Sequence, residues 1–347
     1  MARKKSAELG DELAPPRRGP LRALLLVLVG LLGLALVAGA AVVGIWYFGF
    51  QQTEPEGCTV KTATGTGTLE LPQAANAATI AAVARSRGLP DRATAISLAT
   101  AMQESKLRNL AGGDRDSLGL FQQRPSMGWG TATQIGDPVY ATNKFLDGLV
   151  KVPGYTRLPL TDAAQAVQKS GYPQAYAKHE TKATLLTSAL AGREPGSFTC
   201  VVHDYAKPAP DDSETPTAGA SATPAATPDR TQVLSDRVRR EFGRTVTPAA
   251  GYTSTIKGAE NAVALTPDPS TTALTSSADA GADGGVGAER ASGWEVAHWA
   301  VAQAQQLGIA TVAYDGKIWR KTKSEDGWQP QPTGTSTKLV QVTLAAS

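Results

Sequence analysis

A glutamate at the end of an apolar stretch is the first candidate for chemistry in this sequence. Glu104 follows a run of small and apolar residues from Ala93 to Met102, which predicts a mostly buried helix. Burial disfavours the ionised form of a carboxyl and raises its pKa, and the negative end of the helix dipole acts in the same direction. A carboxyl that keeps its proton near neutral pH can protonate a leaving oxygen, as cleavage of a glycosidic bond requires.

A glycine-rich segment follows this glutamate. Residues 112–125 read GGDRDSLGLFQQRP, and their glycines allow a tight backbone path, such as a wall beside a bound chain. Trp129 comes next and offers a flat apolar ring with a polar edge, which suits stacking on a sugar as well as packing in a core. Without this segment, Glu104 and its neighbours would more simply form a solvated last helical turn.

In this order and at this spacing, Gln103–Leu107 and Gly119–Gln123 resemble two motifs of the lysozyme-like lytic transglycosylase superfamily. Its members cut peptidoglycan with one glutamic acid on an apolar helix, and the resemblance covers about residues 70–200. The family's Gly-Leu-Met-Gln segment has its counterpart in residues 119–122, with Phe in the Met place. The resemblance implies that Glu104 is the acid and base, and that the substrate-binding residues include Ser105, Gln122, Gln123 and Trp129.

The third motif of the superfamily, usually Ala-Tyr-Asn-Ala-Gly, is altered here. Residues 166–173 read AVQKSGYP, so that Gln168 takes the place of the Asn and Tyr172 would supply an aromatic floor. With the following residues 176–180 (YAKHE), this segment resembles a cell-wall lytic variant of the superfamily. The departure leaves open an alternative in which an inactive lysozyme-like domain binds glycan strands or envelope partners.

The type of reaction depends on a second carboxylate. An inverting hydrolase holds water on a base about 6.5 to 9.5 Å from the acid, whereas a lytic transglycosylase lets the muramyl 6-hydroxyl attack and needs one acid. Asp114 and Asp116 are the candidates for such a base, but aspartates in a glycine-rich loop are also ordinary turn formers. The one-acid route, with Glu104 as general acid and then base, is therefore favoured over an inverting muramidase.

An uncharged apolar run over residues 23–48 predicts one transmembrane helix, since about 26 residues make roughly 39 Å of helix and a bilayer core is about 30 Å thick. Basic residues in 1–22 and Glu54 and Glu56 after the run place the N-terminal tail in the cytoplasm and the bulk of the chain outside. A signal peptide cleaved near Ala38-Gly39-Ala40 is the alternative. The length of the run and the aromatic residues 46–48, which suit an interfacial anchor, favour retention.

Cysteine, histidine and charge limit the other classes of function. Cys58 and Cys200 are the only cysteines, and in an oxidising compartment they most simply pair with each other. The three histidines (His179, His203 and His298) have no ligand-like spacing, and no phosphate loop or metal motif occurs. The net charge of +3, with acids and bases interspersed, indicates no nucleic-acid partner. We therefore expect neither a metal nor a cofactor.

The expected fold is an all-α lysozyme-like domain over residues 58–203 behind the membrane helix. Its helices are predicted over 72–87, from Asp91 through the apolar run, and over 140–149, 162–168 and 172–190. Residues 204–230 are rich in Pro, Ala, Thr, Ser and Asp, which predicts a disordered linker that lets a further module move.

Residues 231–347 predict a small α+β module with a low-complexity insertion at about 266–291. Its expected elements are amphipathic helices over 233–242 and 294–307, the second ended by Gly308, a hairpin of 311–314 and 317–320 that turns at Asp315-Gly316, and a strand over 338–344. Its large apolar groups (Trp294, Trp299, Trp319 and Trp328) are expected to form a core rather than a glycan surface, and His298 to be structural.

Together these features predict a membrane-anchored, extracytoplasmic enzyme that cleaves the β-1,4 bond between MurNAc and GlcNAc. The expected partners are peptidoglycan glycan strands, the bilayer through residues 23–48, and envelope proteins through the C-terminal module.

Overall fold

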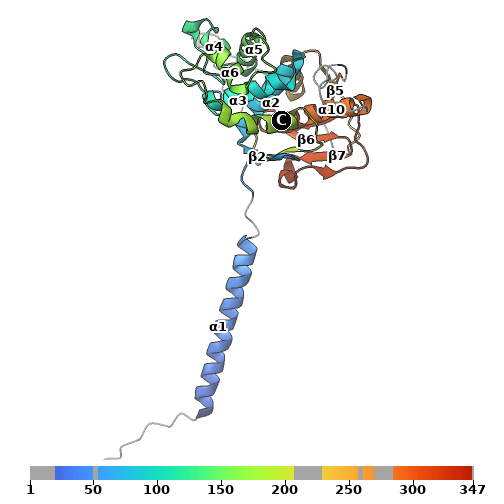
Figure 1. Ribbon diagram of the computed structural model, residues 1–347. Coiled ribbons are helices and arrows are strands. Elements are labelled where there is room, and N and C mark those ends of the chain that lie inside the picture. The colour runs from blue at the N-terminus through green and yellow to red at the C-terminus, as the bar shows by residue number, and fades with distance from the viewer. Residues whose placement is uncertain are drawn as a thin grey trace, which may run out of the picture. The chain divides into compact units, whose positions relative to one another are not determined.

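The computed structural model describes residues 20–49, 54–206, 229–256, 261–268, 270 and 284–345. The chain divides into two compact units, residues 1–54 and 55–347, and the described part of the first is essentially one helix, α1 (Pro20–Gly49) (Figure 1). Most of the predicted cytoplasmic tail, most of the predicted linker and the central part of the predicted insertion lie outside the described residues.

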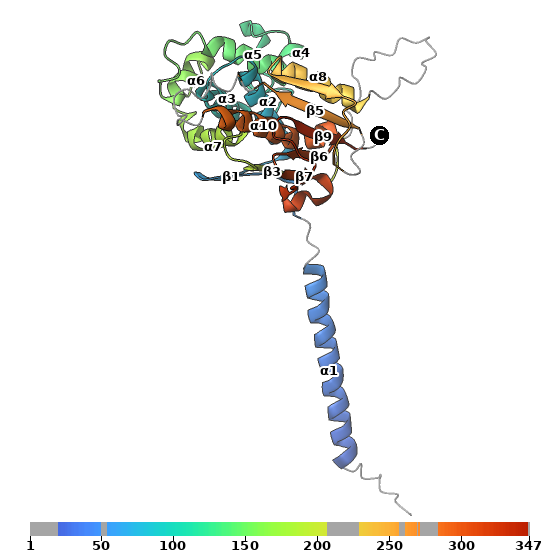
Figure 2. The same cartoon turned by 90° about the vertical axis from the view of Figure 1, so that its right-hand side faces the viewer.

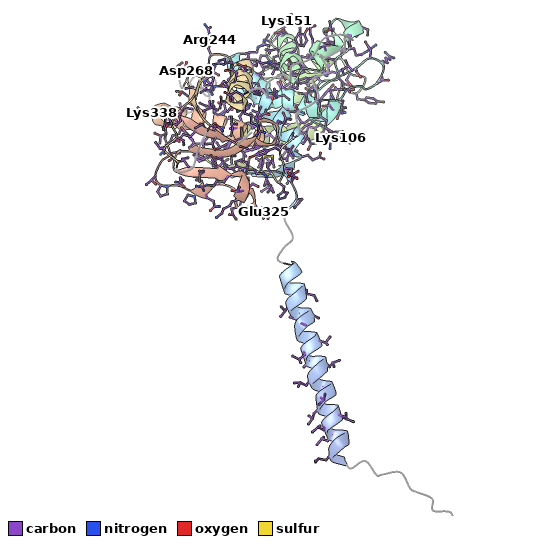
Figure 3. The ribbon with its side chains drawn as sticks, turned by 180° about the vertical axis from the view of Figure 1, so that it is seen from behind. Lys106, Lys151, Arg244, Asp268, Glu325 and Lys338 are labelled. Carbon is purple, nitrogen blue, oxygen red and sulfur yellow. A yellow bond between two sulfur atoms is a disulfide. The ribbon has the colours of Figure 1, made fainter. Side chains whose placement is uncertain are left out.

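Helix α1 contains a 22-residue stretch, Leu24–Ile45, that is long and apolar enough to cross a membrane. Its side chains project on all sides of the helix (Figure 3), and those of Leu24 and Leu34 are 58% and 70% exposed. A span and a signal sequence share these properties. The helix and a disulfide in the second unit together indicate a secreted or membrane-anchored protein. The side chains of the predicted aromatic anchor at 46–48 lie outside those described.

The middle of the chain is mostly helical, as predicted. Its helices are α2 (Leu71–Ser86), α3 (Asp91–Ser105), α4 (Ala132–Ile135), α5 (Pro138–Leu149), α6 (Leu160–Gln168) and α7 (Glu180–Leu190), with 3-10 turns η1 (Pro125–Met127) and η2 (Ala177–His179). The prediction that the last helix begins at Tyr172 is wrong. Pro173 disfavours a helical conformation at the residue before it, and the backbone N–H of Tyr172 instead donates to the Ser170 hydroxyl.

The segments that flank these helices form a small sheet, so the all-α expectation is wrong. Strands β1 (Gly57–Thr62), β2 (Gly65–Leu69) and β3 (Phe198–Val201) pair in the order β2-β1-β3. Cys58 lies opposite Cys200 in the β1–β3 register, and the two form the predicted disulfide across a sequence separation of 142. By the chain-entropy model, a loop of this length is worth up to about 5 kcal/mol of stability.

The C-terminal part is built on a six-stranded antiparallel sheet of order β4-β5-β9-β6-β7-β8. Its elements are α8 (Arg230–Phe242), β4 (Val246–Ala250), β5 (Ala262–Pro267), α10 (Gly284–Ala302), α11 (Ala304–Leu307), β6 (Ile309–Tyr314), β7 (Lys317–Arg320), η3 (Lys321–Asp326), β8 (Gln329–Pro330) and β9 (Val340–Leu344). The predicted hairpin is confirmed, because Tyr314 pairs with Lys317 and both turn residues, Asp315 and Gly316, have positive φ. Helix α10 begins inside the predicted insertion.

Helix α10 joins the two predicted modules in one core. It lies between α2 and α7 on one side and strands β5 and β6 on the other (Figure 2). An ion pair of 2.7 Å joins Arg85 Nη1 of α2 to Glu295 Oε2 of α10, and both side chains are 8% exposed. Glu241 of α8, fully buried, accepts hydrogen bonds from Thr79 and Trp299. The sequence predicted two modules joined by a mobile linker, whereas the structure has one continuous core.

The tryptophans of the C-terminal part belong to this core, as expected. Trp294, Trp299 and Trp319 are at most 1% exposed, and Trp328 is partly buried against the same cluster. Trp319 Nε1 donates to the Cys200 carbonyl at 3.0 Å, so the indole ties the sheet to the disulfide-bonded strand β3.

His298 is a buried group whose titration is coupled to folding. Its Nδ1 lies 2.8 Å from the Ala189 carbonyl oxygen, and burial lowers its pKa from 6.5 to about 4. The unfolded chain therefore binds an additional proton between these values, so the stability that His298 contributes is present above pH 6.5 and is lost as the pH falls towards 4. Glu295 acts in the opposite direction between pH 4.5 and about 7, because burial raises its pKa despite Arg85.

We expect the His298→Asn variant to separate these two effects. Asn keeps a donor for the Ala189 carbonyl and removes the titration, but it loses the ring contacts with Trp294 and Trp328, so the variant is less stable than the wild type at pH 7. The difference in free energy of unfolding should shrink as the pH is lowered from 7 to 4.5. Urea unfolding of both proteins at a series of pH values measures it, and a difference that stays constant would contradict the assignment.

Candidate active site

Helix α3 carries Glu104 to the rim of a cavity. The helix is buried from Ala93 to Met102, as predicted, and it ends at Lys106, which has a left-handed backbone conformation. Glu104 is partly exposed, and its Oε1 accepts a hydrogen bond from the Tyr176 hydroxyl at 2.7 Å. The carboxyl is therefore held by one buried donor and faces open space on its other side.

The cavity has a volume of about 680 Å³ and is walled by the end of α3, the glycine-rich loop and the end of α6. Of the residues singled out in the sequence, it brings together Glu104, Asp114, Gln122, Gln123, Trp129 and Gln168. Ser105, Asp116 and Tyr172 are not among its lining residues. The end of α3, the loop that follows it and the end of α6, about 40 residues further along the chain, thus meet around one carboxyl.

The glycine-rich loop follows the tight path that its composition predicted. Leu118 and Gln123 exchange backbone hydrogen bonds of 2.9 and 3.0 Å. Gly119 has a φ of 73°, and a Cβ there would lie 2.6 Å from the Ile135 carbonyl oxygen. A Cβ on Gly113 would lie 1.7 Å from Gln122 Oε1. Any larger residue at these two positions would displace the cavity wall.

Two side chains from different helices hold this loop. The Ser105 hydroxyl donates to the Leu120 carbonyl at 2.7 Å, and Gln168 Nε2 donates to the Phe121 carbonyl at 2.8 Å. Ser105 is only 4% exposed, so it positions the loop and does not reach a ligand in this arrangement. Gln168 combines this contact with a place on the cavity wall.

The two loop glutamines differ in their freedom to bind a ligand. Gln122 is engaged within the loop, since its Oε1 accepts from the Ser117 hydroxyl at 3.0 Å and its Nε2 donates to the Gly119 carbonyl at 3.2 Å. Gln123 is 2% exposed, and its Nε2 donates to the Ala141 carbonyl at 3.1 Å. Its Oε1 is buried without a hydrogen-bond partner within the described part of the chain. A buried amide oxygen of this kind favours a donor from a ligand or a water.

The two candidate second carboxylates lie in different surroundings. Asp116 accepts from Arg124 Nε at 2.6 Å and from the Ser126 backbone N–H at 2.8 Å, and these donors hold its pKa well below the usual range. Asp116 therefore forms a structural ion pair with Arg124. Asp114 is exposed and lines the cavity with Glu104, so it is the better placed of the two to act as a base.

The two aromatic candidates, Trp129 and Tyr172, also lie in different surroundings. Trp129 is partly buried against the core and lines the cavity, whereas Tyr172 is 78% exposed and forms no part of the wall. Of the two aromatic residues predicted to bind substrate, only Trp129 lines the cavity.

Tyr176 contacts the candidate acid, although the sequence did not single it out as a site residue. It is fully buried, and its pKa is raised by burial and, to a lesser extent, by the hydrogen bond and charge of Glu104. The hydroxyl therefore stays protonated and donates to the carboxyl. Tyr176 lies 72 residues from Glu104, and its only signal was its place in the YAKHE segment. No group of metal-binding side chains occurs among the described residues.

The fold defines a mixed α/β protein with an N-terminal apolar helix, a mostly helical middle with a small sheet, and a C-terminal antiparallel sheet. Residues 272–339 match a family model described as VldE, C-terminal domain. No curated protein matches the chain. The family match includes all of α10 and strands β6 to β8 but none of the residues that line the cavity.

Proposed function

We propose that this protein is a membrane-anchored, extracytoplasmic peptidoglycan lytic enzyme that cleaves the β-1,4 bond between MurNAc and GlcNAc. The observation that carries the proposal is the Glu104 carboxyl, held by Tyr176 at 2.7 Å, in a cavity that also presents Trp129 and three glutamine side chains. A volume of about 680 Å³ is in the range of small-molecule sites. An aromatic ring and amides are the groups that bind sugar faces and acetamides.

The surroundings of the aspartates favour the one-acid route. Glu104 gives its proton to the leaving oxygen of GlcNAc as the glycosidic bond breaks, and the muramyl 6-hydroxyl then attacks the same anomeric carbon. The hydroxyl proton returns to Glu104, and a 1,6-anhydro ring is formed. Because Asp116 is engaged by Arg124, an inverting muramidase would have to use Asp114.

The membrane anchor is the second part of the proposal. The apolar stretch Leu24–Ile45 follows a segment rich in Lys and Arg, which supports a cytoplasmic N-terminal tail and an extracytoplasmic second unit. The disulfide suits an oxidising compartment outside the cytoplasm.

Product analysis tests the reaction. The purified segment 51–347 is incubated with peptidoglycan, and the soluble sugars are examined by mass spectrometry. Anhydro-muramyl ends would establish the one-acid route, and reducing muramyl ends would indicate hydrolysis with Asp114 as the base. Cosedimentation with the wall without products would favour the inactive binding domain. Gln168, in the altered third motif, is already hydrogen-bonded to the Phe121 carbonyl. This observation supports the alternative of a binding domain.

The Tyr176→Phe variant tests whether Glu104 works as positioned. Loss of a hydrogen bond to a charged group is worth about tenfold, so we expect kcat to fall about tenfold with little change in KM. Turnover of soluble glycan strands gives both constants. Tyr155→Phe, a partly buried tyrosine packed on the same core and absent from the cavity wall, is the matched control. An unchanged kcat in Tyr176→Phe would contradict a positioning role.

A further inference from the structure

The cavity has a basic residue that the proposed reaction leaves unused. Arg124 and Lys169 both line it. The Arg124 guanidinium is engaged, since its Nε contacts Asp116 at 2.6 Å and its Nη2 contacts the Ser126 hydroxyl at 3.2 Å. Lys169 forms no ion pair with any of the described residues. Its ammonium is therefore the positive charge of this cavity that is available to a ligand.

The backbone around Lys169 keeps this wall open. Lys169 ends α6 in a left-handed conformation with a φ of 51° and a ψ of 40°, a position where glycine is usual because it has no Cβ. This chain has a lysine there in spite of the unfavourable conformation. Gly171 lines the same wall, and a Cβ on it would meet no atom within 4 Å. The cavity wall therefore has free space beside Gly171.

The charge of Lys169 has a natural complement on a muramyl strand. A neutral β-1,4 glycan carries only hydroxyls and acetamides, which require no cation. The muramyl residue differs by its lactyl group, which ends in a carboxylate on a peptide-free strand or continues into a stem peptide that carries carboxylates of its own. Asp114 lines the same cavity and would repel such a group, so a cation is needed where it binds.

We propose that Lys169 binds a carboxylate carried by the muramyl residue and thereby makes the site select muramyl strands over neutral β-1,4 glycans. This inference rests on the proposed function, because it takes the cavity to be the glycan site. Lys169 is a specificity residue in this arrangement and takes no part in the proton transfers of Glu104.

Binding measurements in a Glu104→Gln background test the inference without cleavage. Isothermal titration calorimetry compares the Glu104→Gln protein with the protein that also carries Lys169→Gln. The ligands are peptide-bearing strands, amidase-stripped strands with free lactyl carboxylates, and chitin oligomers of equal length. We expect Lys169→Gln to weaken binding of at least one carboxylate-bearing strand about five- to tenfold, and raising the salt should reduce this difference. Binding of chitin oligomers should not change. The strand that shows the loss identifies the source of the carboxylate.

Three further variants separate charge from conformation. Lys169→Arg should bind within about twofold of the parent protein, because it keeps the charge. Lys169→Gly relieves the left-handed backbone and should behave as Lys169→Gln does. Lys151→Gln changes an exposed lysine after α5 (labelled in Figure 3) that does not line the cavity, and it should leave all affinities unchanged.

Equal affinities of the Lys169 and Lys169→Gln proteins for both carboxylate-bearing strands would overturn the inference, as would an equal loss for chitin oligomers. The proposed function is judged separately, by whether the protein with Glu104 intact releases anhydro-muramyl or reducing products. Cleavage with unchanged binding in Lys169→Gln would leave an enzyme without this specificity residue. Lysine-dependent binding without cleavage would instead leave a selective binding domain.

Discussion

Replacing Glu104 by Gln will lower the rate of strand cleavage by about 10²- to 10⁴-fold, the usual contribution of a general acid and base. The amide has the shape of the carboxyl, so it can still accept the hydrogen bond that Tyr176 donates at 2.7 Å. It cannot give a proton to the leaving oxygen or take one from the 6-hydroxyl. Affinity for the wall should therefore remain while release of soluble muropeptides stops.

Cosedimentation with peptidoglycan and mass spectrometry of the supernatant measure these two properties on the same sample. Asp162→Asn is a matched control, because Asp162 is an exposed acid in the first turn of α6 outside the cavity. Lysis retained by Glu104→Gln would remove Glu104 from the mechanism. Wall binding by a wild-type protein that releases nothing would replace the enzyme by a binding domain.

Local signals in the sequence correctly predict the structure where a single residue type determines the backbone conformation. Gly308 ends α11 in a left-handed conformation, and Asp315 and Gly316 have the positive φ of a tight hairpin turn. The glycine-rich loop is a similar case, since Gly113 and Gly119 have no room for a Cβ. These features depend on residues that are close together in the chain. The residue types at these positions are therefore enough to predict them.

Contacts between distant segments could not be predicted in this way. The pairing of β1 with β3 depends on residues about 140 positions apart, so the short strands looked like loops on either side of a helical domain. The hydrogen bond between Tyr176 and Glu104 spans 72 positions and follows no spacing rule. The open wall at Lys169 exists only once α6 and the loop have packed together.

The helix that begins before Trp294 differs from its prediction in one respect. The segment from Trp294 onward was interpreted as an amphipathic helix, yet every residue from Ser292 to Ala304 is buried. A helix without a polar face is a core helix with neighbours on all sides. Helix α2 has the same property, with buried residues around its whole circumference. Two such helices in contact indicate that the middle and C-terminal parts are halves of one core.

A chain that ends after Ala206 will therefore fail to fold, although it keeps every residue of the candidate active site and both cysteines. It loses α10, and with it Glu295, the buried partner of Arg85. It also loses Gln303, whose Nε2 donates to the Ala75 carbonyl and the Thr79 hydroxyl at 3.1 Å. The loss of α10 also exposes the apolar side chains of α2 and α7 that it covers, at a cost of about 1.5 to 3 kcal/mol for each large side chain. The sum approaches the whole stability of an ordinary domain, about 5 to 15 kcal/mol.

Near-UV circular dichroism and urea unfolding of residues 51–206, compared with residues 51–347, measure the effect. We expect the shorter chain to lack a cooperative transition even with the disulfide formed. Coexpression with residues 229–345 should restore the transition, because the buried contacts of α10 require no covalent connection. A cooperative transition and wall cleavage by residues 51–206 alone would show that the C-terminal part is an accessory module after all. Loss of folding that coexpression reverses would mean that the cavity is built on a scaffold to which both halves of the chain contribute.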